Sequence, residues 1–423
     1  MYPNHNWAGN YEYHASELYI PETVEQVREI IAESRKIKVL GTRHSFNGIA
    51  DSSGAHLSLE KLNRVIKLDR DKLRVTVEGG IRYGDLCRYL DKEGYALHNL
   101  ASLPHITVAG ACATATHGSG VRNANLAAAV HGMEIIRSYG DVMTFSRDQE
   151  NGIGVEAAAV SLGGLGAVTK MTLGIVPAYE MRQFVYANLP MEQLQAHFEE
   201  IVSAAYSVSL FTDWKTSSVN QVWLKHRTID GTADGMTTDF FGAVRFSENV
   251  HPITGLSGEN CSEQMGLPGP SFERLPHFRM EFTPSFGEEL QSEYFVPRQY
   301  AYQALSSLSQ LKEHISPLLY VSEVRTIAKD ELWMSPCYMQ DSVAIHFTWK
   351  PYWNEVRQVL PMIEERLAPL GARPHWAKLF TMPPSQVQAL YERLPEFRKL
   401  LLSCDPEGKF RNDFLNTYLC KKD

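Results

Sequence analysis

The chain has 423 residues, of which 44% are hydrophobic and 21% charged, and its formal net charge is −8. This length predicts about two to three domains with enough chain to bury sizeable cores, and the composition is ordinary for a soluble globular protein. Because no basic run appears and an acidic chain repels phosphate backbones, the sequence argues against a nucleic-acid binder, and any bound phosphate must be held by local backbone donors.

The first elements predicted in chain order are a helix and two strands. Residues 22–35 place apolar side chains on one helical face, and Pro21 and Thr23 mark the start of this helix. Residues 37–40 form an apolar run typical of a buried strand. Between residues 73 and 77 apolar and polar residues alternate, which is the period of a strand. Short helices and strands in this order indicate an α+β fold.

The next elements continue this mixture. Residues 83–94 outline a short helix that stops at Gly94. Residues 134–136 and 142–145 flank a polar turn and predict a hairpin, and residues 172–175 predict a further strand.

The second half of the chain differs in composition. Glycines thin out beyond Pro177, and residues 180–375 are richer in aromatic residues. The polar segment 228–258 predicts a long surface loop, and residues 405–412 predict a turn that leads to the last residues. No tandem repeat or low-complexity tract interrupts the chain.

Three segments rich in small residues are expected to be loops: residues 41–47, 108–120 and 161–169. The first follows the strand at 37–40, and such glycine-led turns present backbone N–H groups to anions. Neither a G-x-G-x-x-G after the first strand nor a P-loop motif occurs, which disfavours the Rossmann and P-loop classes. Any one of these loops alone could hold ordinary turn glycines. Together they favour a cradle for an extended, phosphorylated cofactor, which a backbone without bulky side chains can approach closely.

Polar residues also alternate within two apolar runs of the second half. Glu323 and Arg325 are two residues apart, which places them on one face of a strand, and His346 and Thr348 repeat that spacing. Two neighbouring strands of this kind would form the floor of a hydrophilic pocket. From the residues alone, a surface salt bridge is the better interpretation of Glu323 and Arg325, and Lys378 would be an ordinary solvated lysine.

Several separated segments resemble one family of flavoproteins, the vanillyl-alcohol-oxidase type, and within it the alditol oxidases, which are bacterial relatives of L-gulonolactone oxidase. The segments that carry the resemblance are residues 41–47, 101–106, 114–120, 206–214, 275–279 and 405–412. The resemblance implies an α+β, two-domain fold of the PCMH-type FAD-binding kind, whose α+β cap domain carries an antiparallel sheet. Residues 1–179, completed by 380–423, would bind FAD, and residues 180–379 would form the substrate-binding cap.

The resemblance implies that FAD is bound covalently, with His44 attached to the flavin. Attachment requires a neutral imidazole, which a group of pKa about 6.5 provides near pH 7. The alternative is a histidine that merely packs against the cofactor or a turn. The other residues matched to cofactor contacts are Val39, Leu40, Gly41, Thr42, Arg43, Ser45, Ser102, Thr107, Gly110, Thr114, Ala115, Thr116, His117, Val168 and His375. For His105 and His117, a structural role and a cofactor contact are equally open.

The implied reaction is the oxidation of the C1 primary alcohol of a polyol such as xylitol or sorbitol to the aldose. Hydride would pass to flavin N5, and O2 would be reduced to hydrogen peroxide. The residues matched to catalytic roles are Arg325, Lys378 and Glu323, and those matched to substrate binding are Ser102, Glu323, Arg325, His346, Thr348 and Lys378. Positive charge from Arg325 and Lys378 would favour alkoxide character as hydride departs. Ala101, if it borders the flavin, leaves a narrow path for oxygen.

Two alternatives stay open. An aldonolactone oxidase or dehydrogenase of the L-gulono-1,4-lactone type would dehydrogenate a ring substrate at C2. A flavin-binding sensor without turnover belongs to a different class of protein.

The remaining expectations concern compartment and partners. The six cysteines lie far apart without a C-x-x-C, which gives neither a zinc ribbon nor a disulfide framework, and we expect no metal site. The N-terminus has no secretion signal, and no run approaches the ~20 apolar residues of a membrane helix. We therefore expect a cytoplasmic monomer whose partners are a small polyol and O2, with no nucleic acid or membrane.

Overall fold

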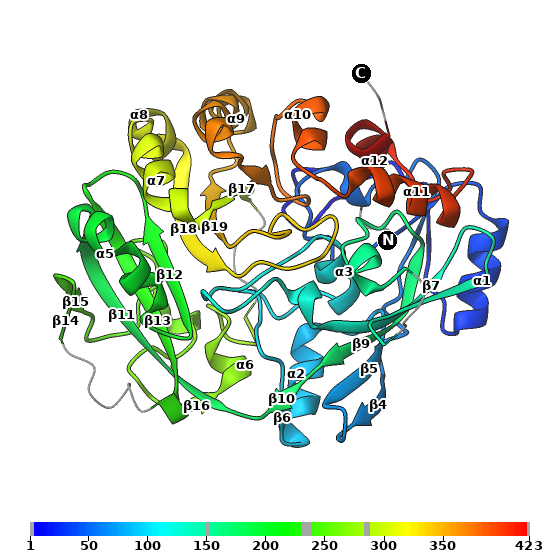
Figure 1. Cartoon of the computed structure of the whole chain (residues 1–423), viewed down its shortest axis with the longest axis horizontal. Coiled ribbons are helices and arrows are strands. Elements are labelled where there is room, and N and C mark those ends of the chain that lie inside the picture. Colours follow the sequence, from blue (N-terminus) through cyan, green and yellow to red (C-terminus); the bar gives the residue numbers. More distant parts are fainter. Residues whose placement is uncertain (1–3, 149–152, 231–237, 283–287, 421–423) are drawn as a thin grey trace.

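The computed structural model describes residues 4–148, 153–230, 238–282 and 288–420. In Figure 1 the blue, cyan and red parts of the chain occupy one half of the molecule, and the green to orange parts occupy the other. The first residues and the last residues of the chain therefore build the same half.

The first half begins with a small parallel sheet covered by a helix. Its strands are β1 (Glu17–Tyr19), β2 (Ile37–Val39) and β3 (Ala55–Leu57), in the order β1-β3-β2. The predicted helix is α1 (Val24–Glu33), and the Thr23 side chain caps it by accepting a hydrogen bond from the Gln26 N–H at 3.2 Å. Val27 and Ile31 on its inner face are fully buried against this sheet. The predicted helix start and the predicted strand are both confirmed.

An antiparallel sheet of five strands forms the rest of this half, in the order β4-β5-β9-β7-β8. The expected hairpin is formed by β7 (Val130–Ile136) and β8 (Val142–Ser146), in which Ile136 pairs with Val142. The other strands of this sheet are β4 (Val65–Asp69), β5 (Arg74–Glu78) and β9 (Ala167–Gly174), and a separate two-stranded pair is formed by β6 (Tyr95–Ala96) and β10 (Val176–Pro177). Two further helices of this half are α2 (Tyr83–Lys92) and α4 (Val155–Ala158).

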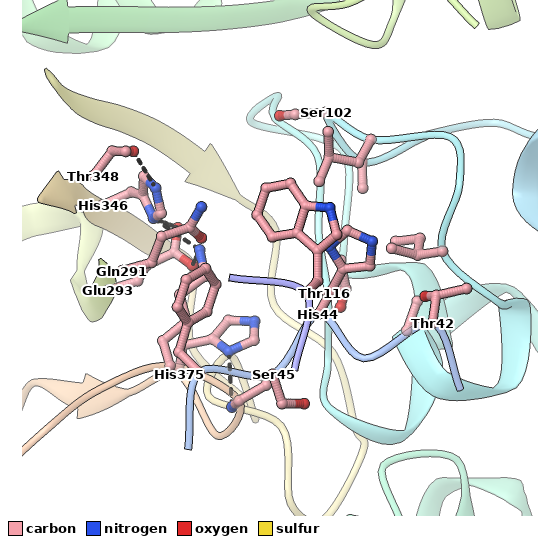
Figure 2. Close-up of a pocket in the computed structure, with 18 of the residues that line it drawn as sticks. Thr42, His44, Ser45, Ser102, Thr116, Gln291, Glu293, His346, Thr348 and His375 are labelled. Carbon is pink, nitrogen blue, oxygen red and sulfur yellow. Dashed lines mark hydrogen bonds and ion pairs between the residues drawn. The ribbon is translucent and has the colours of Figure 1, made fainter. Parts of the chain in front are cut away.

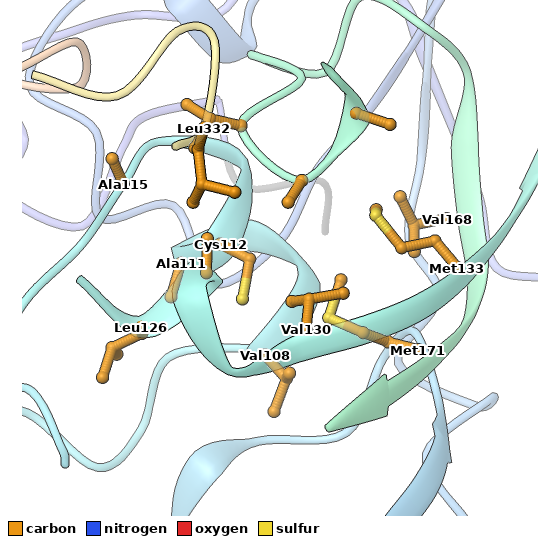
Figure 3. Close-up of a cluster of buried hydrophobic side chains, with 14 of the residues drawn as sticks. Val108, Ala111, Cys112, Ala115, Leu126, Val130, Met133, Val168, Met171 and Leu332 are labelled. Atoms are coloured by element: carbon orange, nitrogen blue, oxygen red, sulfur yellow. The ribbon is translucent and has the colours of Figure 1, made fainter. Parts of the chain in front are cut away.

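Two of the three expected small-residue loops are wrong in part. Residues 108–113 form the helix α3 (Val108–Ala113), because alanine is the best helix former and the small side chains pack closely. The third loop ends earlier than expected, since β9 already begins at Ala167 and pairs there with Ile136. Figure 3 shows α3 packed into a cluster of buried side chains that includes Cys112, Val130 and Met171. The helix therefore anchors the second segment to the core of this half.

The second half contains a ten-stranded antiparallel sheet, in the order β14-β15-β11-β13-β12-β18-β19-β17-β20 with β16 beside β11. Its strands are β11 (Glu180–Pro190), β12 (Ser207–Thr212), β13 (Ser218–Arg227), β14 (Asp239–Phe240), β15 (Ala243–Arg245), β16 (Gly269–Pro270), β17 (Leu290–Pro297), β18 (Leu319–Ile327), β19 (Ser342–Trp349) and β20 (Arg373–Pro374). The short strands β14 and β15 fall inside the expected loop at 228–258, of which residues 231–237 lie outside the described part.

Helices cover one face of this sheet and leave the other face for the site. They are α5 (Met191–Ser203), α7 (Ala301–Ser309), α8 (Lys312–Ile315) and α9 (Trp353–Leu367). Apolar residues of α5, α7 and α9 pack on the strands in one buried cluster that includes Leu194, Leu305, Leu360 and Val324. The short helix α6 (Ser271–Arg274) precedes a loop on the opposite face, at residues 275–282.

The end of the chain returns to the first half through α10 (Pro384–Ala389), α11 (Leu394–Cys404) and α12 (Asp413–Leu415). The predicted turn at 405–412 is confirmed, because the buried Asp405 carboxylate accepts hydrogen bonds from the Lys409 and Phe410 N–H groups at 2.7 and 2.9 Å. The Asn412 side-chain amide donates to the carbonyls of Gly48, Ile49 and Asp51 at 2.9, 3.1 and 2.8 Å. This contact closes the turn after β2.

Short 3-10 helices and one π-helical turn connect these elements, at Gly48–Ala50, Leu126–Ala129, Thr228–Asp230, Gly258–Asn260, Arg298–Tyr300, Ser316–Leu318, Ala368–Leu370 and Asn416–Cys420. In the described part of the chain, no helix combines the length and the apolar character that crossing a membrane requires.

Asp330 makes part of the stability depend on pH. Its buried carboxyl group accepts hydrogen bonds from Asn125 Nδ2 and Ser335 Oγ, both at 2.6 Å, and from the Leu332 N–H at 2.9 Å. Burial raises the pKa of Asp330 from 3.8 to about 6. The folded state therefore holds this proton more tightly than the unfolded chain. The stabilisation from protonated Asp330 is complete below the ordinary pKa of 3.8 and is lost as the pH rises through about 6.

We expect this loss to show in the difference in unfolding free energy between the wild type and Asp330→Asn, measured by urea denaturation. The difference should shift against the wild type by up to about 3 kcal/mol between pH 4 and pH 7. A difference that stays constant over this range would show that Asp330 titrates at its ordinary pKa.

Candidate functional site

A cavity of about 750 Å³ is lined by both halves of the molecule. One wall is formed by residues 38–46 after β2, by residues 101–103 and by small residues of α3 and the segment that follows it. The opposite wall is formed by β17, β18, β19 and residues 375–378. In Figure 2, Thr42, His44 and Thr116 lie on the first wall, and Glu293, His346 and Thr348 lie on the second. The first wall therefore presents loop backbone and small side chains to the cavity, and the second wall presents charged and polar side chains.

His44 lines the first wall in the loop after β2. The preceding residue Arg43 has φ of 64°, a left-handed conformation that turns the chain sharply before the histidine. The Trp7 ring lies 4.7 Å from the imidazole, measured between ring centroids. Burial, together with the nearby His105, Arg43 and Arg82, lowers the pKa of His44 to about 4. The imidazole is therefore neutral near pH 7, as bond formation at a ring nitrogen requires.

Gly41 lets the loop after β2 approach the start of α3 closely, because a Cβ there would lie 2.8 Å from Thr107 Oγ1. Within α3 itself, a Cβ at Gly110 would lie 2.7 Å from the same atom. A larger side chain at Gly41 would push the loop after β2 away from the start of α3. The result is a long wall of backbone and small side chains, which suits an extended nucleotide cofactor.

Lys38 is a charged residue of this wall that the sequence reasoning missed. Its buried ammonium group donates to the carbonyls of Leu162, Gly163 and Phe410 at 3.2, 3.0 and 3.2 Å. Burial lowers its pKa to about 7, and Asp405 opposes that shift. A lysine inside the apolar run at 37–40 was the available signal.

Most residues matched to cofactor contacts line the cavity: Val39, Leu40, Gly41, Thr42, Arg43, His44, Ser45, Ser102, Thr107, Gly110, Thr114, Thr116, His117 and His375. Two others, Ala115 and Val168, are absent from the described lining and belong to the hydrophobic core (Figure 3). Val168 does not line the cavity because it lies within β9, where it pairs with Ile135, and not in a loop. His105 is also outside the lining, and its ring contacts the Phe282 carbonyl at 2.9 Å.

Three neighbouring strands form the second wall. In the register of the sheet, Glu293 of β17 stands opposite His346 of β19, which stands opposite Glu323 of β18. Arg325 and Thr348 follow two residues further along their strands and therefore lie on the same face. The expectation that residues 323, 325, 346 and 348 share one face of adjacent strands is confirmed.

Glu293 is the centre of this wall, and sequence reasoning missed it. Its carboxylate is 1% exposed and contacts Arg325 NH2 and Lys378 Nζ, both at 2.8 Å, and His117 Nε2 at 3.3 Å. The cations hold the pKa of Glu293 well below its ordinary value, although burial alone would raise it. The available signal was the pair Gln291 and Glu293, which has the same two-residue spacing as the pairs on β18 and β19.

Lys378 and His346 form a short chain of hydrogen bonds beside Glu293. The Lys378 ammonium group lies 2.7 Å from His346 Nδ1, and His346 Nε2 lies 3.1 Å from Thr348 Oγ1. An ammonium group only donates, so Nδ1 must be the acceptor and the proton of the neutral ring is on Nε2. Burial lowers the pKa of His346 well below its ordinary value. Thr348 thus accepts from His346, and its own hydroxyl proton remains for a ligand.

Glu323 and Arg325 are buried, not on the surface. Their side chains are both 7% exposed, and Glu323 Oε2 lies 3.5 Å from Arg325 Nε. Glu323 Oε1 contacts His277 Nε2 at 2.8 Å. The interpretation as a surface salt bridge is therefore wrong, because β18 faces the cavity here. The pKa of Glu323 is lowered by Arg325 and His277 against the opposing effect of burial.

The second wall is close to electrically balanced. Arg325 and Lys378 contribute two positive charges, and Glu293 and Glu323 contribute two negative ones. Burial lowers the pKa of Lys378, and Glu293 opposes that effect by favouring the charged form. Together with the half-buried Ser102 on the opposite wall, the cluster offers several donors and acceptors to an uncharged ligand rich in hydroxyl groups.

Comparison with known proteins adds a second line of observation. Residues 15–146 match the FAD binding domain family, and residues 278–418 match the D-arabinono-1,4-lactone oxidase family. The chain is 44% identical to an alditol oxidase of Streptomyces sp. (strain IKD472), over 98% of each chain. It is 27% identical to the L-gulonolactone oxidase of Mus musculus, over 97% of this chain and 96% of the relative.

Solved structures show the same fold. The crystal structure of cholesterol oxidase from B. sterolicum matches with a TM-score of 0.77 at 14% identity, over 98% of this chain and 96% of that one. The expected α+β fold of the vanillyl-alcohol-oxidase type is confirmed.

Proposed function

We propose, since this chain belongs to the alditol oxidase family of FAD-binding proteins, that it oxidises the C1 primary alcohol of polyols such as xylitol and sorbitol to the aldose, with O2 reduced to hydrogen peroxide. The observation that supports this most is the second wall, where buried charged and polar side chains with nearly balanced charge face one cavity. Such a surface suits a ligand that is uncharged and carries several hydroxyl groups.

The cofactor fits the first wall. The cavity there is bounded by glycines and small side chains, and bound FAD would supply the hydride acceptor for the alcohol. Residues 1–179 with 380–423 would hold it, and residues 180–379 would form the cap that binds the substrate. His44 would be the covalent attachment point, supported by its neutral imidazole and its place in the lining.

The residues of the second wall would act on the substrate hydroxyls. Arg325 and Lys378 would stabilise negative charge on the C1 oxygen as its hydrogen leaves, since donors held in a buried site need no reorganisation. Glu323, Thr348 and Ser102 would orient the remaining hydroxyls, each through a hydrogen bond worth about 1–3 kcal/mol. His346 would contribute by orienting the Thr348 hydroxyl, to which its Nε2 donates. A simple alcohol lacks those partners and would leave the buried groups unsatisfied.

A substrate panel coupled to peroxide detection tests this function. Xylitol, sorbitol and L-gulono-1,4-lactone should be assayed in parallel, each with and without O2. Peroxide formed from the polyols and not from the lactone supports an alditol oxidase. Preference for the lactone would support the aldonolactone enzyme, whose family matches residues 278–418. Protein that keeps its flavin and turns over none of them would be a sensor.

Replacing His44 with alanine tests the covalent bond. In the wild type, flavin should stay with the protein after acid precipitation, because a carbon–nitrogen bond survives denaturation. In His44→Ala, all flavin should appear in the supernatant, where its absorbance is measured. His14→Ala is the matched control, since the His14 side chain is 74% exposed, and it should keep its flavin. Flavin retained by precipitated His44→Ala would assign the attachment to another residue.

A further inference from the structure

Lys225 is a buried lysine that none of the proposed catalytic roles uses. It lies on β13, is 1% exposed, and donates to the carbonyls of Leu275 and Pro276 at 2.5 and 3.3 Å. Its third partner is His277 Nδ1 at 3.2 Å. Burial lowers the pKa of Lys225 to about 7, and the nearby Glu323 opposes that shift by favouring the charged form. A buried ammonium group is costly unless its hydrogen bonds are satisfied, and these partners satisfy it. The loop after α6 is therefore fastened to the sheet beside the cavity.

His277 connects this lysine to the cavity. Its Nε2 lies 2.8 Å from Glu323 Oε1. The rings of Trp223 and Phe211 stand edge-on to the imidazole, with centroids 5.2 and 5.4 Å away. The side chain is 6% exposed and lines the cavity. The imidazole is thus held on both sides and has little freedom to turn.

Two partners fix which nitrogen of His277 carries the proton. Charged Lys225 has donors and no acceptor, so Nδ1 accepts from it, and the Glu323 carboxylate only accepts, so Nε2 must donate to it. Burial and the neighbouring Lys225 together lower the pKa of His277 to about 4, so the ring is neutral and carries one proton. That proton is on Nε2 and points at Glu323. In a neutral histidine, the hydrogen bond made by one ring nitrogen often determines whether the other nitrogen carries the proton.

The hydrogen bond from His277 determines which oxygen of Glu323 is left to accept from a ligand. With Oε1 of Glu323 committed to His277, Oε2 remains as an acceptor, 3.5 Å from Arg325 Nε. Among the described residues, Arg325 Nε is buried and has no hydrogen-bond partner, and both Glu323 and Arg325 line the cavity. An acceptor and a donor therefore lie side by side, which is the complement of a hydroxyl group that donates and accepts.

We propose that Lys225 and His277 are positioning residues that fix the orientation of Glu323, so that Glu323 and Arg325 together bind one hydroxyl of the polyol. This inference rests on the proposed function. Lys225 acts through His277, and His277 acts through Glu323. Their loss should therefore weaken substrate binding more than it slows the hydride step.

Two amide substitutions of His277 separate positioning from mere packing. The glutamine amide of His277→Gln reaches the place of Nε2 and still donates to Glu323, whereas the asparagine amide of His277→Asn reaches only the place of Nδ1. We expect KM for xylitol to stay within about threefold of wild type in His277→Gln and to rise about tenfold in His277→Asn, with a smaller change in kcat. Equal KM values in two folded, flavin-containing variants would overturn the proposal.

Lys225→Met tests the first step without relying on turnover. Nitrogen-15 NMR of histidine-labelled protein reports whether Nδ1 of His277 carries a proton. In Lys225→Met, Nδ1 loses both its donor and the positive charge that lowers the pKa of the ring, while the Glu323 carboxylate keeps the proton on Nε2. Nδ1 should therefore take up a proton and KM should rise, and an unchanged spectrum would overturn the role of Lys225. Lys409→Met is the matched control, because Lys409 is also buried and donates to backbone carbonyls far from the cap. It should leave the His277 spectrum and KM unchanged.

These readouts keep the two proposals apart. If wild type oxidises no polyol, the proposed function fails, and the NMR result still decides whether Lys225 keeps Nδ1 of His277 unprotonated. If wild type oxidises xylitol but the asparagine and glutamine variants behave alike, the function stands and the positioning role fails.

Discussion

Replacing Lys378 with methionine should lower kcat/KM for the preferred polyol by about 10²–10³-fold while FAD stays bound. The ammonium group is the donor that contacts both Glu293, at 2.8 Å, and His346, at 2.7 Å. Its loss removes positive charge from the place where the C1 oxygen becomes negative. It also frees His346 to adopt the other tautomer, which would then no longer donate to Thr348. The measurement is the rate of flavin reduction by xylitol without oxygen, alongside peroxide formation in air.

Lys350→Met is the control for this substitution. Lys350 follows β19, donates to the Pro317 carbonyl at 2.8 Å and is absent from the described lining of the cavity. We expect its kcat/KM to equal that of the wild type. A Lys378→Met enzyme with full activity and normal flavin content would remove Lys378 from the catalytic residues.

Glu293→Leu should destabilise the protein by about 3–5 kcal/mol, measured by urea denaturation. The reason is that Arg325 and Lys378 would remain buried beside it without their shared counter-charge. The same variant should lose polyol turnover, since both cations lose the anion that holds them in place.

Glu364→Gln provides the matched comparison. Glu364 is also buried, but its partners are neutral donors: the hydroxyl groups of Tyr294 and Thr381, at 2.8 and 2.6 Å, and the Thr381 N–H. Burial raises its pKa. An amide in its place should cost about 1 kcal/mol. If Glu293→Leu costs no more than Glu364→Gln, the pairing with Arg325 and Lys378 does not stabilise the fold.

Local patterns in the sequence were sufficient to predict the elements that depend on residues close together in the chain. The cap of α1 at Thr23, the hairpin β7–β8 and the two-residue spacing on β18 and β19 all depend on neighbours in the chain. The polar residues of the second wall on β18 and β19 were predictable for the same reason. The sequence did not predict whether these residues face solvent or a cavity, because that depends on which face of the sheet the helices cover.

The residues that were missed are those whose role arises from distant contacts. Glu293 shows the same spacing as Glu323 and Arg325, yet only the strand order β18-β19-β17 brings it between Arg325 and Lys378. His277 comes from a loop and has no periodic pattern at all. Val168 was assigned to a glycine-rich loop because the start of β9 depends on its partner strand β7.

The contact of Asn412 with the loop after β2 has a consequence for biosynthesis. The two segments are separated by 364 residues, and the same late turn supplies the Phe410 carbonyl to Lys38. A chain still emerging from the ribosome therefore lacks the contacts that hold the loop after β2 long after the segment with His44 has been translated. We expect nascent chains that stop before residue 405 to acquire no cofactor, so that flavin loading follows translation.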